Sequence, residues 1–292
     1  MEVTLSNLGI WFMRLVALLP LPVVRGLGWL LGWILYLLVR PRRKVVRINL
    51  LLCFPELPAH VRRRLELDIF IKFAQSWLDR GWLWHAPFSV LKKRVQMTGD
   101  IASLNSAAPT VIFAPHFMGL DAGGMALGLY MTRSLTSIYT DQSNKVVDEW
   151  MLKGRMRFNN VQLFGRADGV RDIAAALKAG KPLYLLPDMD FGEKDSLFVP
   201  FFGVPTATVP SLARFARLGD AQVISAVTRM TPQGYVTEVS KPWAGFPSGN
   251  LAADTARMNA ELETLIRTMP GQYYWVHKRF KTRLPGDADF YA

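Results

Sequence analysis

Residues 108–130, APTVIFAPHFMGLDAGGMALGLY, contain the pattern that decides the fold. Residues 109–114 form a short apolar run, long enough for a buried strand and too short for a helix. Pro115 ends this run, and from Met118 onward small and apolar residues recur at the spacing of a tightly packed buried helix. The stretch therefore predicts a strand followed by a helix, with His116 in the turn between them.

A carboxylate follows this histidine at short range. Asp121 lies five positions after His116, so the two side chains can meet only if His116 lies outside the helix. The carboxylate would then accept a hydrogen bond from one ring nitrogen and leave the other nitrogen as a base. Backbone amides of residues 117–119 are candidate donors to an oxyanion. The alternative is a core histidine with an aspartate that the helix dipole stabilises.

Short strands and helices alternate along the rest of the chain, which predicts the α/β class, with a mostly parallel central sheet flanked by helices. Strands are expected near residues 137–140, 182–186, 221–228 and 235–240, and helices over 59–84, 208–218 and 251–269. The strand at 182–186 delivers Asp188 and Asp190 to a loop, as the first strand delivers His116. Because active sites gather at the carboxyl ends of parallel strands, Asp188 is a further candidate.

Two other features of this region bear on chemistry. Asp188 and Asp190 could suggest a metal site, but only Glu193 and Asp195 add carboxylates at a suitable spacing, and no histidine does so. We therefore predict no metal site. Residues 198–205, FVPFFGVP, are expected to form an apolar loop suited to an acyl groove or to the edge of the core.

The N-terminal segment is apolar over residues 5–39 and is interrupted by Pro20 and Pro22. Each of the two pieces is shorter than the roughly 20 residues of a spanning helix, so each would lie in the interface or enter partway as a hairpin. A single kinked helix running through the prolines would span the bilayer. Residues 40–47, RPRRKVVR, are basic and belong on the cytoplasmic side. We expect a retained, apolar membrane-anchoring helix within residues 1–47 and a catalytic domain over residues 48–292.

Composition limits the partners and excludes several enzyme classes. Lys and Arg number 35 against 23 Asp and Glu, a net charge of +12, and 50% of residues are hydrophobic, which favours an anionic membrane over nucleic acid. The single Cys53 excludes an intramolecular disulfide and a cysteine zinc site. No G-x-S-x-G elbow, Walker loop or G-x-G-x-x-G after a strand occurs. Near the C-terminus, Lys278 and Arg279 lie among aromatic residues, a mixture suited to phosphate contacts or to an ordinary basic tail.

Four stretches together resemble the late acyltransferases of lipid A biosynthesis, the lauroyl and myristoyl transferases of the lysophospholipid acyltransferase superfamily. They are APHFMGLD at 114–121, residues 139–158 ending in KGRMRF, LPDMDFGEKDSLFVPFFGVPTATVP at 186–210, and PGQYYWVHKRFKTR at 270–283. Their order and spacing also match, and the resemblance covers nearly the whole chain.

The resemblance implies an α/β acyltransferase on the cytoplasmic face of a Gram-negative inner membrane. It would move a fatty acyl chain from acyl carrier protein to a hydroxyl of a lipid A precursor, without a cofactor. By motif match His116 is the general base and Asp121 the carboxylate that orients it. Arg155 matches an arginine associated with the phosphorylated substrate, and Asp188 matches the acidic residue of the third motif. Lys278 and Arg279 would add substrate contacts.

Two other functions remain open at this point. Lipid A members of the family often have Glu where this chain has Asp121, whereas glycerolipid acyltransferases commonly have Asp, so a lysophospholipid or another lyso-lipid is an alternative acceptor. A non-catalytic module that binds anionic membranes, with His116 and Asp121 as structural residues, is the alternative from a different class. Binding to nucleic acid is disfavoured because the basic residues are interleaved with apolar ones.

Overall fold

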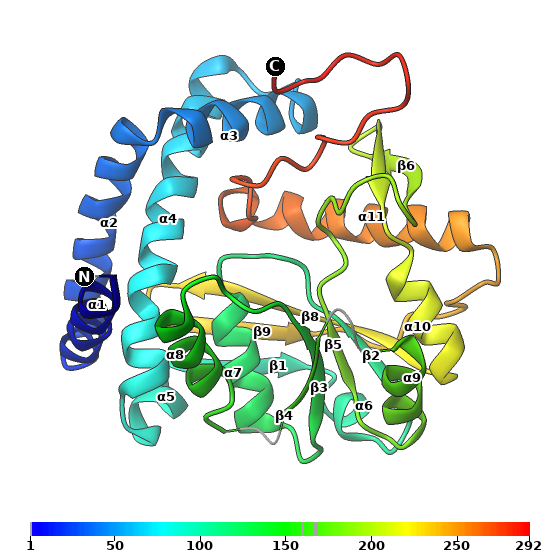
Figure 1. The fold of residues 1–292 in the computed structure, drawn as a ribbon, viewed down its shortest axis with the longest axis horizontal. Coiled ribbons are helices and arrows are strands. Elements are labelled where there is room, and N and C mark those ends of the chain that lie inside the picture. The colour runs from blue at the N-terminus through cyan, green and yellow to red at the C-terminus, as the bar shows by residue number, and fades with distance from the viewer. Residues whose placement is uncertain (1, 159–160, 166–168) are drawn as a thin grey trace.

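The computed structural model describes residues 2–158, 161–165 and 169–292. At its centre lies a seven-stranded sheet in the order β1-β9-β8-β2-β5-β3-β4 (Figure 1). Neighbouring strands run parallel except β8 and β9, which form an antiparallel hairpin. The strands are β1 Val95–Gly99, β2 Thr110–Phe113, β3 Leu135–Tyr139, β4 Val161–Gly165, β5 Leu183–Leu185, β8 Gln222–Thr231 and β9 Gly234–Val239. The predicted α/β class with a mostly parallel central sheet is confirmed.

Helices cover both faces of this sheet because successive side chains of its central strands point to opposite sides. Val111 and Phe113 of β2 belong to one buried cluster, and Ile112 between them belongs to the other. The first cluster packs against α9 Val170–Lys178, α10 Ser211–Gly219 and α11 Leu251–Thr268. The second packs against α7 Leu120–Tyr130, α8 Lys145–Arg155 and the C-terminal half of α4 Ala59–His85. The remaining short helices are α5 Phe88–Arg94, α6 Ile101–Asn105 and η1 Pro270–Gln272.

The N-terminal segment forms two helices, α1 Glu2–Val16 and α2 Leu21–Leu38, followed by α3 Arg40–Cys53, which contains the basic stretch. The predicted break at the prolines is confirmed. By length and composition, α2 is the one helix in the described part of the chain that is apolar enough to cross a membrane.

Helix α2 lies along α4 over most of its length (Figure 1). Two glycines on the facing side allow the close approach. A Cβ added to Gly28 would lie 2.7 Å from Gln75, and one added to Gly32 would lie 2.5 Å from the backbone of Ile71. The other side of α2 exposes large apolar side chains, namely Leu27, Trp29, Leu30, Ile34, Leu37 and Leu38. One face of α2 is therefore fixed to the rest of the protein and the other is bare.

The prediction of an apolar loop at residues 198–205 is wrong. This region is a hairpin of β6 Leu197–Phe201 and β7 Val204–Thr208, and it packs against α11. The chain reverses at Phe202 and Gly203, both of which have positive φ (48° and 75°), the geometry of a two-residue hairpin turn. The side chain of Phe201 is fully buried, so the apolar residues here supply core.

Candidate active site

His116 and Asp188 meet at the carboxyl edge of the sheet because their strands are parallel neighbours. Phe113 of β2 lies opposite Leu185 of β5, and each of these residues is followed by one residue, a proline and then the polar side chain. His116 and Asp188 are thus at equivalent positions beyond their strands. The Nδ1 atom of His116 lies 2.7 Å from Oδ1 of Asp188.

The second carboxylate oxygen of Asp188 is also fully engaged. Oδ2 accepts hydrogen bonds from the backbone amide of His116 and from the hydroxyl of Tyr273, each at 3.0 Å. Burial alone would raise the pKa of this carboxyl, but the His116 ring and these hydrogen bonds outweigh burial and hold the pKa below its usual range. An ionised, fixed carboxylate therefore orients the ring of His116 and leaves its Nε2 as the available nitrogen.

Both carboxylate oxygens of Asp121 bond arginines, while the ring of His116 bonds Asp188, so the predicted pairing of His116 with Asp121 is wrong. Its Oδ2 accepts a hydrogen bond from Nε of Arg80 at 2.7 Å, and its Oδ1 accepts one from Nε of Arg155 at 3.0 Å. Burial acts to raise the pKa of Asp121, but the two arginines outweigh it and hold the pKa far below its usual range. Asp121 is the second residue of α7 and faces α4 and α8, so its partners come from those helices.

These side chains line one cleft. His116, Asp121 and Arg155 all border it, together with Arg80, Tyr139 and His277. The side chain of His116 is 23% exposed, which leaves it accessible from the cleft. His116 also borders a second opening, on the side of α10, which Met189, Lys194, Val209 and Ser211 line.

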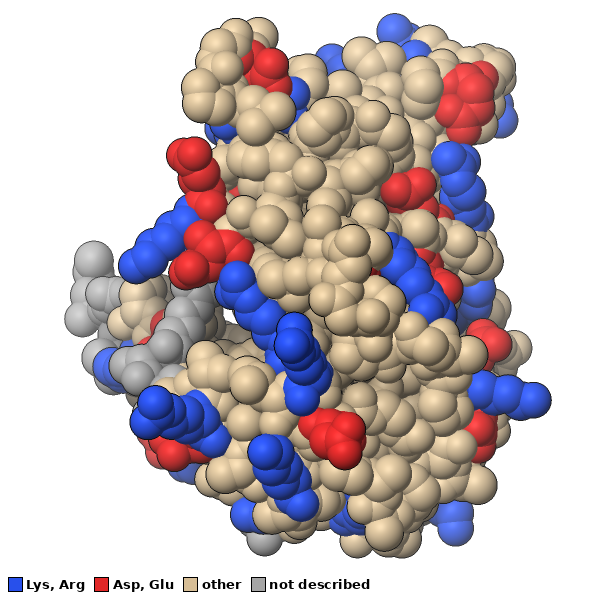
Figure 2. Space-filling model, turned by 90° about the vertical axis from the view of Figure 1, so that its right-hand side faces the viewer, with Lys and Arg blue, Asp and Glu red and all other residues tan. Residues whose placement is uncertain are grey.

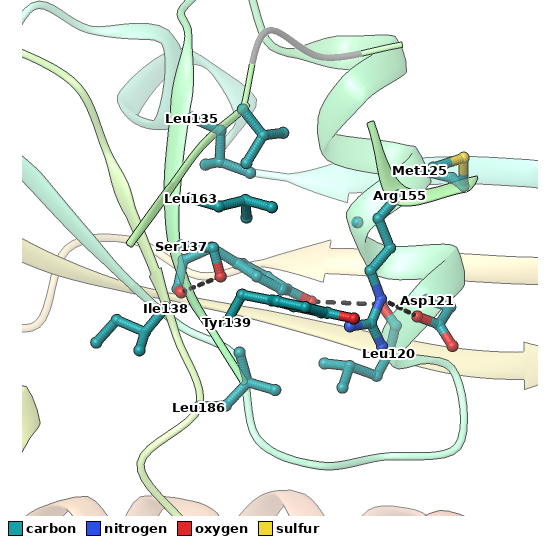
Figure 3. Close-up of a pocket in the computed structure, with 13 residues that line it drawn as sticks. Leu120, Asp121, Met125, Leu135, Ser137, Ile138, Tyr139, Arg155, Leu163 and Leu186 are labelled. Atoms are coloured by element: carbon teal, nitrogen blue, oxygen red, sulfur yellow. Dashed lines mark hydrogen bonds and ion pairs between the residues drawn. The ribbon is translucent and has the colours of Figure 1, made fainter. Parts of the chain in front are cut away.

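An apolar pocket adjoins the cleft (Figure 3). Leu120, Asp121, Tyr139 and Arg155 line both, so the pocket begins beside the Asp121–Arg155 ion pair. Figure 3 shows Arg155 beside Asp121 on one side of the pocket, with Leu135, Leu163 and Ile138 on the other. The apolar lining consists of Leu120, Met125, Leu135, Ile138, Val161, Leu163 and Leu186. The pocket is therefore an apolar space that opens beside the polar side chains of the cleft.

The two basic residues expected near the C-terminus do not line the cleft. Arg279 is 1% exposed, and its guanidinium donates to the carbonyl of Ala207 and the hydroxyl of Thr208, each at 2.9 Å. These two bonds fix β7 in place, and the burial of the guanidinium keeps it away from a phosphate in the cleft. Lys278 is on the surface, with its Nζ 5.3 Å from the centre of the Tyr291 ring. The tail instead contributes Tyr273 and His277 to the site.

The expected oxyanion donors are also largely occupied. The amide of Phe117 donates to the carbonyl of Pro115, and the amide of Met118 donates to the carbonyl of Gln272, both at 2.7 Å. The first bond lies within the turn after β2, the second joins this turn to η1, and together they fix the position of His116.

Arg80, Tyr273 and His277 belong to this site and were not predicted from the sequence, and Asp188 was predicted without its partner. The equal offset of His116 and Asp188 from the ends of two apolar strands was the signal that would have joined them. Arg80 carries no such signal, because it lies within an otherwise regular amphipathic helix.

Comparison with known proteins agrees with this architecture. Residues 2–282 match the family described as bacterial lipid A biosynthesis acyltransferase. The lipid A biosynthesis palmitoleoyltransferase of Escherichia coli (strain K12) is 31% identical over 98% of this chain and 94% of its own length. The lauroyltransferase of the same organism is 31% identical over 97% of this chain and 93% of its own length, and the myristoyltransferase is 28% identical over 97% and 89%.

A match along nearly the whole chain includes the strands that carry His116 and Asp188 and the helices that carry Arg80, Asp121 and Arg155. The chain belongs to the bacterial lipid A biosynthesis acyltransferase family and is an acyltransferase.

Proposed function

We propose that this enzyme transfers a fatty acyl chain from acyl carrier protein to a hydroxyl of a lipid A precursor, with His116 as the general base and Asp188 as the carboxylate that orients it. The observation that carries the proposal is the 2.7 Å contact between Nδ1 of His116 and a buried, ionised Asp188 in a cleft that adjoins an apolar pocket. A general base must lie at a position where a substrate hydroxyl can reach its free nitrogen, and the exposed edge of His116 meets this requirement.

The reaction follows from these contacts. Nε2 of His116 takes the proton of the acceptor hydroxyl as its oxygen attacks the thioester carbonyl, and Asp188 stabilises the resulting imidazolium. The tetrahedral intermediate collapses, the carbon–sulfur bond breaks, and the imidazolium returns its proton to the departing thiolate. The acyl group passes directly to the acceptor, without an acyl-enzyme. The one thiol of the chain supports this route, because burial raises the pKa of Cys53 and keeps it protonated.

The apolar pocket of Figure 3, with a free volume of about 110 Å³, is the proposed site of part of the acyl chain. Its entrance beside Asp121 and Arg155 is part of the cleft that contains His116. Gly124 lines the pocket, and a Cβ added there would meet no atom within 4 Å. A glycine at this position leaves space for hydrocarbon that a larger side chain would take.

The opening on the side of α10 is the proposed route of the donor. Lys194 lines this opening, and Arg214 and Arg217 of α10 are exposed nearby. Figure 2 shows basic side chains, interspersed with acidic ones, on the side of the molecule that includes α9 and α10. Acyl carrier protein is acidic, so exposed arginines beside the opening support its docking there.

We also propose that the N-terminal helices bind the cytoplasmic leaflet of the inner membrane and lie in its plane. The outward side chains of α2 are strongly exposed, with Trp29 at 51%, Leu30 at 53% and Leu38 at 74%. Contact of the glycine face of α2 with α4 argues against a helix that crosses the bilayer alone. Basic residues of α3 follow directly and favour anionic headgroups.

Acyl transfer to two acceptors tests the function. Purified enzyme in vesicles is given labelled acyl carrier protein together with either a lipid A precursor or a lysophospholipid. Transfer to the lipid A precursor alone is expected. Transfer only to the lysophospholipid would overturn the acceptor and preserve the chemistry, and donor that is never consumed would indicate the non-catalytic membrane-binding module.

A further inference from the structure

Asp121 occupies only part of the hydrogen-bonding capacity of its two arginines. Each carboxylate oxygen accepts from the Nε atom of one guanidinium, so the Nη groups of Arg80 and Arg155 are not used by Asp121. Within the described residues, Nη1 of Arg80 is buried and has no hydrogen-bond partner. A buried donor without a partner is costly, and here it belongs to a residue that lines the substrate cleft.

The two guanidinium groups are also held rigidly. The guanidinium carbon of Arg80 lies 4.1 Å from the centre of the Trp77 ring, and that of Arg155 lies 5.8 Å from the centre of the Tyr139 ring. The Arg80 and Arg155 side chains are only 15% and 35% exposed, respectively. Preorganised, partly desolvated guanidinium groups bind oxyanions strongly because little entropy is lost on binding.

The charges favour an anion as ligand. Two arginines and one aspartate leave one net positive charge, and no other Asp, Glu, Lys or Arg lines the described cleft. A structural purpose alone, in which Asp121 ties α4, α7 and α8 together, would account for the two ion pairs. It would not account for two partly exposed guanidinium groups that line the same cleft as His116.

We infer that Arg80 joins Arg155, for which the resemblance already implies a phosphorylated substrate, in one binding site for a phosphate group, and that Asp121 holds the two arginines together. This inference rests on the proposed function, since it assigns the phosphate to the acceptor lipid or to the pantetheine arm of the donor. Arg80 is a phosphate-binding residue, and Asp121 is a positioning residue that acts through both arginines. The site fixes the substrate by its phosphate while the acceptor hydroxyl lies at His116.

Kinetics of Arg80→Gln test the site, with Arg64→Gln as the matched control. Arg64 is an exposed arginine of the same helix, so the control removes the same charge away from the cleft. A hydrogen bond to a charged group contributes about 1.5–3 kcal/mol, so KM for a phosphorylated acceptor should rise about 10-fold to 150-fold in Arg80→Gln, with kcat little changed. Arg80→Lys retains the positive charge but loses the planar, two-pronged guanidinium, so its KM should lie between those of wild type and Arg80→Gln.

Substrates that lack phosphate identify its source. If the phosphate belongs to the acceptor, the effect of Arg80→Gln disappears with a dephosphorylated acceptor. If it belongs to the donor, the effect disappears when an acyl-pantetheine replaces the phosphate-bearing donor. Equal losses with phosphate-bearing and phosphate-free forms of both substrates would show that Arg80 is only structural and would overturn the site.

A binding measurement keeps the site testable if the proposed function fails. Trp77 stacks on Arg80, so tryptophan fluorescence should change saturably when inorganic phosphate is added at constant ionic strength. The change should be present in wild type and Arg64→Gln and absent in Arg80→Gln. The same response in all three proteins, or in none, would contradict the phosphate site whether or not acyl transfer occurs.

Discussion

Asp188→Asn changes the partner of His116 with almost no change in volume. The Asn amide retains one oxygen, which can still accept from the hydroxyl of Tyr273, but its NH₂ group now faces Nδ1 of His116. The ring is then driven to the tautomer with the proton on Nε2, so it cannot accept the proton of the acceptor. The charge that stabilises the imidazolium is lost as well.

The expected size of this effect follows from the role of a general base. Proton transfer by a positioned side chain contributes about 10²-fold to 10⁴-fold, so kcat of Asp188→Asn should fall by roughly that factor. Both KM values should change little, because Asp188 is fully buried and does not touch the substrates. The assay is steady-state transfer from acyl carrier protein to a lipid A precursor, with thermal unfolding to confirm that the variant is folded.

Two comparisons sharpen this test. His116 and Asp188 act as a unit, so the double variant of Asp188→Asn with His116→Ala should be no slower than His116→Ala alone. Asp121→Asn should act mainly on KM, through Arg80 and Arg155. If Asp188→Asn retained a kcat close to that of wild type while Asp121→Asn lost as much as His116→Ala, then the assignment of Asp188 as the orienting carboxylate would be refuted.

Three further predictions concern the pocket, the donor and stability. Gly124→Leu should place a side chain in the apolar pocket and shift preference toward shorter acyl chains, measured with donors of increasing chain length; an unchanged preference would place the chain elsewhere. Arg214→Glu combined with Arg217→Glu should raise KM for acyl carrier protein severalfold at low ionic strength and leave transfer from acyl-pantetheine unaltered, whereas equal effects on both donors would exclude a docking role. His277 accepts from the amide of Asp190 at 3.2 Å, and burial, followed by neighbouring positive charges, lowers its pKa from 6.5 to about 4. Neutral His277 therefore stabilises the fold fully above pH 6.5 and progressively less as the pH falls to 4. Over this window the free energy of unfolding, measured with denaturant, should fall by up to roughly 3 kcal/mol more in wild type than in His277→Gln. Equal decreases in the two proteins would contradict this prediction.

Local pattern predicted most of the fold. The break at Pro20, the long helix over residues 59–84 and the β8–β9 hairpin all appear near the expected positions, because proline, helical periodicity and turn residues act over a few positions. The hairpin at residues 197–208 was missed, since dense aromatic residues concealed a turn that depends on positive φ at Phe202. The expected division of the chain at residue 47 falls inside α3, whose Val46 and Leu50 are buried in the core.

Pairings across the site depended on strand order, which the sequence does not state. His116 and Asp188 are 72 positions apart, and they meet because β5 lies directly beside β2 in the sheet. Asp121 was predicted as the partner of His116 instead, because it lies only five positions away in the sequence. Arg279 shows the same limit, because a basic residue in a tail gives no sign that buried carbonyl and hydroxyl oxygens require its guanidinium.

Acyl transfer by His116→Ala tests the central chemistry most directly. The variant is compared with wild type in vesicles, with labelled acyl carrier protein and a lipid A precursor, after unfolding and vesicle-binding measurements show that both proteins are folded and membrane-bound. Wild type should transfer the acyl chain, and the variant should be slower by at least about 10²-fold. Transfer by the variant at close to the wild-type rate would contradict a base role for His116.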